Sequence, residues 1–163
     1  MRNIVITAIA GIGALAMTAA QRSPWLVWNA STSVPIGLYR TDGSAPLRGE
    51  LALLRLPMTI ANVANERGYL ARSAYLLKPV AAVGGDRVCR FGSAIFVRGR
   101  LSASADVQDT HGRLLPTWHG CQQLSVTDVF ILGATRDSFD SRYFGPIAGD
   151  HVVGRARPVL IFK

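Results

Sequence analysis

Beyond Ser73 the chain is a series of short apolar segments, separated by turns that contain glycine or proline. The segments are Tyr75–Val83, Arg87–Phe91, Ala94–Val97, Val129–Leu132 and His151–Phe162, the last interrupted by Pro158. Such segments are typical of strands, and no segment with helical spacing lies between them. This pattern predicts a small, mostly antiparallel β domain rather than an alternating βαβ sheet.

The first half of the chain predicts further strands and one helix. Apolar segments at Trp25–Trp28 and Glu50–Leu56 are expected to be strands. Pro57–Leu70 has a proline at its start, an apolar face at helical spacing and a glycine near its end, so it is expected to be the one soluble helix. The polar stretch Ala103–Gly120 is expected to be an irregular loop.

The N-terminus carries an apolar stretch without charge or proline, from Asn3 to Ala20. Its length is close to the minimum for a membrane-spanning helix and exceeds a usual signal-peptide core. We therefore expect residues 1–22 to be a single transmembrane signal anchor; cleavage after the small residues ending at Ala20 is the alternative. Arg2 ahead of the stretch favours a cytoplasmic N-terminus. Residues 23–163 are then expected to form a domain on the periplasmic side of a bacterial inner membrane.

The chain has two cysteines, Cys89 and Cys121. An even pair in an exported domain is a disulfide candidate, and closing a loop of about thirty residues would stabilise the fold by roughly 3–4 kcal/mol. Zinc binding is a weak alternative, because the three histidines lack ligand spacing relative to this pair. No metal and no cofactor is expected.

The net charge of +8 is spread along the chain. A basic surface can bind nucleic acid, anionic lipid headgroups or an acidic partner. No nucleic-acid-binding motif is visible, and a location across the membrane makes nucleic acid the least favoured of these partners.

Lys78 is an exception to the use of arginine in this chain. Of the 18 basic residues all but Lys78 and the C-terminal Lys163 are arginine. Lys78 lies within the apolar segment Tyr75–Val83, where burial can strip the proton from a lysine but not from an arginine. The resulting neutral amine would act as a base. The ordinary alternative is a lysine at a strand edge, with its stem packed and its head in water.

Ser33 lies in a turn in which Pro35 restricts the backbone and Gly37 allows the chain to reverse. A rigid turn can project a hydroxyl and a backbone N–H, although serine is also an ordinary turn former. A serine needs a base to become a nucleophile. Because no histidine is near Ser33 or has a clear carboxylate partner, a Ser–Lys pair with Lys78 is favoured over a Ser–His–Asp triad.

The segment Arg136–Gly145 alternates short polar residues with charged ones. This composition suits a hydrogen-bonded loop in which Asp140 pairs with Arg142 and a serine hydroxyl is free to orient another group. A solvated loop with an incidental ion pair is the alternative.

Together these segments resemble the type I signal peptidase family (peptidase S26), and most closely its TraF-type conjugal-transfer peptidases. Four motifs carry the resemblance in order: T-S-V-P-x-G-L-Y, L-L-K-P-V-A-A-V-G-G-D-R-V, D-S-F-D-S-R-Y-F-G-P and V-V-G-R-A. It covers the chain from about Trp28 to Arg157. It implies a small antiparallel β domain of signal-peptidase type with one short helix, after a single N-terminal transmembrane helix.

The resemblance implies a role for each matching residue. Ser33 matches the nucleophile and Lys78 the general base. Ser31 matches a hydroxyl that assists the backbone N–H of Ser33 in the oxyanion hole, and Ser138 matches the serine that hydrogen-bonds the lysine amine.

Asp140 and Arg142 match a structural pair that supports the site. Three departures from ordinary leader peptidases favour the specialised subgroup. Gly133–Thr135 stands where those enzymes carry a glycine–aspartate–asparagine motif, Pro79 replaces a commonly basic residue, and Val34 replaces a usual methionine.

The resemblance thus implies a membrane-anchored serine endopeptidase with a Ser/Lys dyad and no cofactor, acting on a membrane-bound protein precursor. In the subgroup that precursor is a propilin for conjugative transfer by type IV secretion, and some members also join the ends of the subunit. One alternative is a general signal (leader) peptidase that processes signal-peptide-bearing proteins. Another is a non-catalytic anchored component of the secretion apparatus. Self-cleaving repressor peptidases share the Ser–Lys chemistry, but they are cytosolic, so the N-terminal anchor argues against them.

Overall fold

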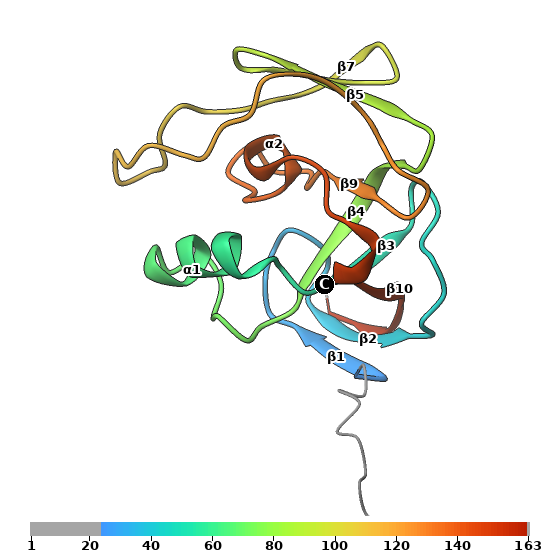
Figure 1. Ribbon diagram of the computed structural model, residues 1–163. Coiled ribbons are helices and arrows are strands. Elements are labelled where there is room, and N and C mark those ends of the chain that lie inside the picture. The colour runs from blue at the N-terminus through green and yellow to red at the C-terminus, as the bar shows by residue number, and fades with distance from the viewer. Residues whose placement is uncertain (1–23, 163) are drawn as a thin grey trace, which may run out of the picture.

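The computed structural model describes residues 24–162, which form two antiparallel sheets and short helices (Figure 1). The larger sheet contains β1 (Leu26–Asn29), β2 (Gly37–Thr41), β3 (Leu51–Leu54), β4 (Leu76–Val83), β9 (Val129–Ile131) and β10 (Val152–Ile161). The smaller sheet contains β5 (Arg87–Phe91), β6 (Ala94–Val97), β7 (Arg100–Ser104) and β8 (Gly120–Gln123). The helices are α1 (Met58–Glu66), α2 (Ser141–Phe144) and a single 3₁₀ turn, Gly149–His151. The prediction of a mostly antiparallel β domain is confirmed.

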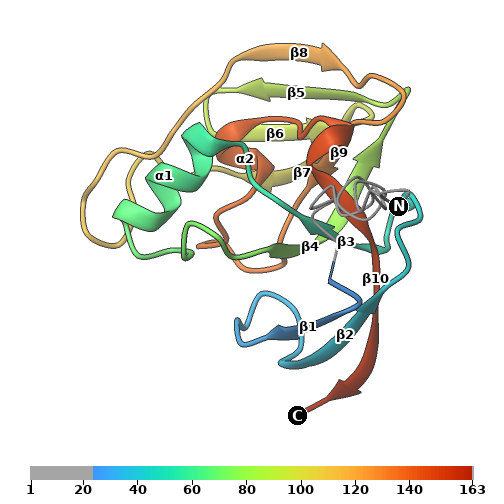
Figure 2. The same ribbon diagram turned by 60° about the horizontal axis from the view of Figure 1, so that its bottom comes forward.

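The two sheets pack against each other through a shared core cluster, in which Ala82 of β4 and Phe130 of β9 lie with Val88 and Ile95 of the smaller sheet. The strand order is β1-β2-β10-β3-β4-β9 in the larger sheet and β7-β6-β5-β8 in the smaller one. Figure 2 shows the smaller sheet at the top and the β1–β2 hairpin at the bottom. Strand β4 is an interior strand of the larger sheet, with β3 on one side and the edge strand β9 on the other.

Strand β10 changes register between Pro158 and Leu160. Proline has no backbone N–H to donate to a ladder, so an irregularity at this point is expected. Beside it, Gly37 of β2 approaches the β10 backbone so closely that a Cβ would lie 2.1 Å from the Leu160 carbonyl oxygen. This position therefore requires glycine.

Helix α1 covers one face of the larger sheet. Its buried residues Ala61 and Ala64 pack in a core cluster with side chains of β3, β4 and β9. The helix ends at Glu66, earlier than predicted, and Gly68 follows with a φ of 73°. Glycine adopts this left-handed conformation without the penalty of a Cβ and so ends helices readily.

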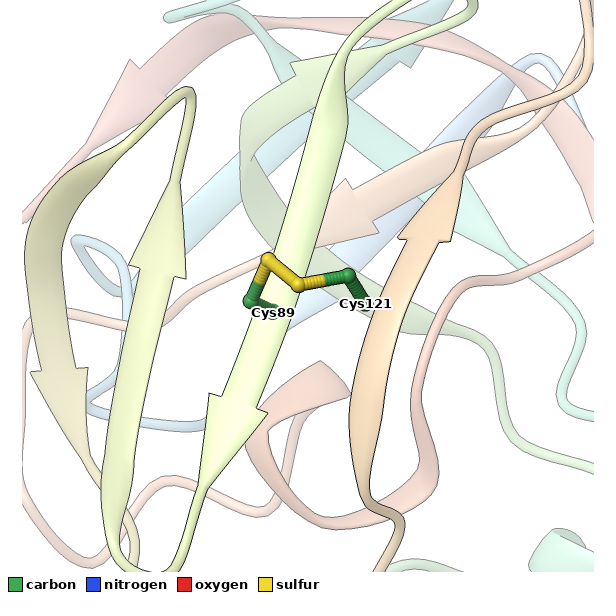
Figure 3. The surroundings of a disulfide bond; sticks show 2 residues. All are labelled: Cys89 and Cys121. Atoms are coloured by element: carbon green, nitrogen blue, oxygen red, sulfur yellow. A yellow bond between two sulfur atoms is a disulfide. The ribbon is translucent and has the colours of Figure 1, made fainter.

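The disulfide between Cys89 and Cys121 is present in the structure, where it joins β5 to β8 (Figure 3). The two residues are direct cross-strand partners in the ladder. The bond therefore fixes the edge strand of the smaller sheet to its neighbour.

Two parts of the sequence prediction were wrong in detail. The stretch Ala103–Gly120 is irregular over residues 105–119, as predicted, but its two ends belong to the edge strands β7 and β8. Both are largely exposed, so they lack the apolar alternation that would mark them in sequence. Helix α2 was also not predicted, because a single turn capped by Asp140 has no sequence periodicity.

The predicted signal anchor at residues 1–22 lies outside the described residues. Within residues 24–162, none of the helices is long and apolar enough to cross a bilayer.

Candidate active site

The turn between β1 and β2 carries Ser31 and Ser33, and the buried side chain of Asn29 holds it in place. The Asn29 amide nitrogen donates to the carbonyls of Ser31, Val34 and Pro35 at 2.8, 3.1 and 3.1 Å. Its oxygen accepts from the backbone N–H of Ser31 at 3.2 Å. One buried amide thus fixes the backbone on both sides of Ser33.

Ser33 forms a hydrogen bond with Ser31, with 3.0 Å between the two hydroxyl oxygens. The Ser31 hydroxyl also donates to the Asn29 side-chain oxygen at 2.8 Å. Because a serine hydroxyl has one proton, Ser33 must be the donor in its bond to Ser31. Within the described part of the chain, no hydrogen bond uses the backbone N–H of Ser33.

Lys78 lies on β4, opposite Ala52 of β3, and its side chain is 5% exposed. Its Nζ donates to the Ser138 hydroxyl at 2.8 Å. Burial lowers the pKa of the Lys78 amine below that of an ordinary lysine, and the negative charge of Asp140 opposes this shift. Lys78 is therefore a buried amine that loses its proton more readily than an ordinary lysine, and not a strand-edge lysine with its head in water.

Ser138 is brought to Lys78 by the loop that leads from β9 to α2. The loop packs closely, since a Cβ on Gly133 would lie 2.2 Å from the Ser138 Oγ. Only glycine fits at that position while Ser138 keeps its place.

A buried ion pair between Asp140 and Arg142 supports this loop. Arg142 Nε and Nη2 donate to the two Asp140 oxygens at 2.8 and 3.1 Å, and both residues are almost fully buried. The same Asp140 carboxylate accepts from the backbone N–H of Gly133 at 2.7 Å, and Arg142 donates to the Gly133 carbonyl at 2.9 Å. The pair therefore fixes the start of the loop that presents Ser138.

Ser31, Ser33, Lys78 and Ser138 all line one groove of about 740 Å³. Aromatic and aliphatic side chains form much of the rest of its wall, among them Leu56, Tyr69, Leu76, Leu115 and Phe139. In residues 24–162 no direct hydrogen bond joins Ser33 to Lys78; the Ser33 hydroxyl is bonded to Ser31, and the amine to Ser138. The groove thus contains a hydroxyl, an amine with a lowered pKa and a free backbone N–H, the groups that acyl transfer requires.

The structure brings together Ser31, Ser33, Lys78 and Ser138 in the groove, with Asp140 and Arg142 behind the loop. Cys89 and Cys121 lie apart from it, in the smaller sheet. Sequence reasoning missed Asn29 and Gly133 as organising residues. Asn29 stands two residues before Ser31 at the end of an apolar strand, where a polar side chain that can bond to the following backbone is a usable signal.

Residues 1–161 match the family model described as signal peptidase, peptidase S26. The plasmid transfer protein TraF of Escherichia coli is 30% identical over 164 residues, which cover 94% of this chain and 93% of that protein. The conjugal transfer protein TraF of Agrobacterium tumefaciens (strain 15955) is 32% identical over 173 residues, covering 99% and 97%. Among solved structures, a signal peptidase I from Enterococcus faecalis V583 is 18% identical, covers 70% of this chain and 98% of that one, and has a TM-score of 0.39.

Proposed function

The chain belongs to the peptidase S26 family of signal peptidases, and from this premise we propose that it is a serine endopeptidase with Ser33 as nucleophile and Lys78 as general base. Family membership and the two transfer-protein relatives support a peptidase role in conjugal transfer. The observation that carries the proposed dyad is the buried Lys78 amine, bonded to Ser138 in the groove that Ser33 also lines.

In the proposed reaction the neutral amine of Lys78 accepts the proton of Ser33 while the Ser33 oxygen attacks the substrate carbonyl carbon. Ser138 accepts one N–H of the amine, which leaves the nitrogen lone pair available for that proton. For this step the Ser33 hydroxyl must turn from Ser31 towards Lys78.

The oxyanion formed in this attack needs donors aimed at it. The unused backbone N–H of Ser33 is one, and the Ser31 hydroxyl is the second once it releases the Asn29 oxygen. A lost donor of this kind typically costs about 10²–10³-fold in rate. The protonated Lys78 then gives its proton to the leaving amine, and water activated by Lys78 hydrolyses the Ser33 ester.

Substitution of Ser33 and Lys78 tests the dyad. Ser33→Ala and Lys78→Ala should each abolish cleavage of a precursor, and Lys78→Arg should also fail because a guanidinium does not give up its proton. A serine-reactive acylating probe, mapped by mass spectrometry of the full chain, should label Ser33 in the wild type. Full activity of Lys78→Arg, or labelling at another residue, would refute the assignment.

We propose further that the substrate is the precursor of a pilin subunit rather than a general secreted protein. Support comes from the relatives, which are named as plasmid and conjugal transfer proteins. Cleavage is measured with a propilin and with an ordinary signal-peptide-bearing precursor. Cleavage of the propilin alone is expected for a peptidase specific for pilin precursors. Equal cleavage of both would favour a general signal peptidase, and mass spectrometry of the pilin product would distinguish a linear chain from a cyclic one.

We propose a location in the bacterial inner membrane, with the peptidase domain in the periplasm. An exposed apolar face, formed by β1 and the end of β10, supports this: Trp25 is 80% exposed, and Trp28 contacts Phe162 with 5.6 Å between ring centroids. Tryptophan is enriched where membrane proteins meet the boundary between bilayer and water. Protease added outside spheroplasts should digest the domain. Protection from the protease would contradict this orientation.

A further inference from the structure

Most carboxylates of this chain have a basic partner. The ten acidic residues include six that pair with an arginine, namely Asp42, Glu50, Asp86, Asp106, Asp109 and Asp140. A seventh, Asp150, lies 3.8 Å from a histidine nitrogen. Over residues 24–162, the three that form no ion pair are Glu66, Asp128 and Asp137. Of these three, Asp137 alone lines the groove.

Three aspartates line the groove, although the chain as a whole carries a net charge of +8. Besides Lys78, the charged residues that line it are Arg67, Asp106, Asp109 and Asp137. Two of these carboxylates are neutralised by arginines that do not line the groove: Asp106 by Arg136 and Asp109 by Arg113, each at 2.7 Å. The carboxylate of Asp137 is exposed and lacks such a partner in the described part of the chain.

Asp137 is also close to the proposed chemistry. It directly precedes Ser138, whose hydroxyl accepts from the Lys78 amine at 2.8 Å. Its negative charge raises the pKa of Lys78, against the larger effect of burial. An unpaired carboxylate at this position therefore disfavours the neutral form of Lys78, which the proposed reaction uses as its base. A cation bound to Asp137 would remove that disadvantage.

Resting on the peptidase function proposed above, we propose that Asp137 is a specificity-determining residue that selects precursors with a lysine or arginine side chain close to the scissile peptide. The carboxylate is at the groove wall next to Ser138, so it can meet a substrate side chain without entering the proton transfer. An ion pair at an exposed position gives a preference of about 5-fold at most. Substrate recognition then uses charge as well as the apolar wall of the groove.

Peptides based on the cleaved precursor sequence test this inference. Lysine, uncharged norleucine or glutamate is placed in turn at each of the three positions on either side of the scissile bond. The full chain in detergent should cleave the lysine peptide about 5-fold faster, in kcat/KM, than the norleucine peptide at one of these positions. Asp137→Asn should remove the preference, and Asp137→Lys should transfer it to the glutamate peptide.

Glu66→Gln is the matched control, since it removes one exposed, unpaired carboxylate outside the groove and should keep the lysine preference. A preference that persists in Asp137→Asn, or no preference at any position while Ser33 is labelled by the acylating probe, would overturn the inference alone. If the wild type showed neither labelling of Ser33 nor cleavage of any peptide, the proposed function would be refuted, and this inference with it.

Discussion

The buried amine of Lys78 makes the rate of acylation depend on pH. Burial lowers the pKa of Lys78, so the neutral base is populated below the ordinary lysine range. We expect the rate of acylation of Ser33 to rise with pH through this lowered pKa and then level off. Single-turnover labelling over a pH series measures it. His111→Gln is the control, because His111 also lines the groove; loss of the pH dependence in that variant would instead indicate a histidine base.

Gly133 packs directly against the side chain of Ser138 and leaves no room for a larger residue. The added methyl of Gly133→Ala would lie 2.2 Å from Ser138 Oγ and 2.7 Å from Ser138 Cβ, so the loop must shift. A displacement of about 1 Å at a catalytic group can cost on the order of 10²-fold in rate. We expect a loss of that order in Ser33 acylation, with a drop of about 1–3 kcal/mol in the free energy of unfolding.

The double variant Gly133→Ala/Ser138→Gly separates crowding from orientation. Because it removes the side chain that the new methyl meets, it should recover the free energy of unfolding but not the rate. Recovery of both would show that Ser138 does not orient Lys78.

At the scale of elements, the long loop between β7 and β8 forms one wall of the groove through its contacts with the segment after α1. Figures 1 and 2 show it extending towards α1. The Asp109 carboxylate accepts hydrogen bonds from the Tyr69 hydroxyl, from Arg113 Nε at 2.7 Å and from the His111 backbone N–H at 2.9 Å. Arg67 donates to the Leu114 carbonyl at 2.7 Å. These bonds fix the position of the wall.

Loosening this wall should affect peptide binding more than chemistry. Asp109→Asn removes the charge and part of the acceptor capacity that hold the loop, so we expect KM for a peptide to rise several-fold. Labelling of Ser33 by a small acylating probe should stay unchanged, because a small probe does not depend on contacts with this wall of the groove. Asp128→Asn, which alters a carboxylate outside the groove, should change neither value. An equal loss in both assays would place Asp109 in the chemistry instead.

For the whole molecule, the disulfide contributes to global stability rather than to the site. It links residues 32 apart in sequence, which corresponds to about 3–4 kcal/mol in the chain-entropy model. The double variant Cys89→Ser/Cys121→Ser should lower the free energy of unfolding by that amount in urea titration. Ser33 acylation should persist under native conditions, since neither cysteine lines the groove. Unchanged stability would show that the bond constrains the unfolded chain little.

The sequence predicted the elements whose burial leaves a local pattern. Strands β3, β4, β5, β6 and β9 have buried apolar residues between turns, and each lies where the pattern placed it. Strands β2, β7 and β8 and helix α2 were missed. Strand β2 begins at the turn residue Gly37 and is short, and exposed edges and a single capped turn have no such pattern. Lys78 and Ser33 could be singled out by composition and turn chemistry, whereas the contribution of Asn29 depends on hydrogen bonds that only the folded turn creates.

The sequence by itself determined the antiparallel β class, the S26 family and the residue types available for chemistry, because periodicity and motif order are local properties of the chain. The tertiary structure alone decided that Lys78 is buried against Ser138, 60 residues away in sequence, and that the Ser33 hydroxyl donates its hydrogen bond to Ser31. Among residues 24–162, it also left Asp137 as the one carboxylate of the groove without an ion-pair partner. Desolvation and charge pairing depend on groups that are distant in sequence and adjacent in space, so no local pattern can record them.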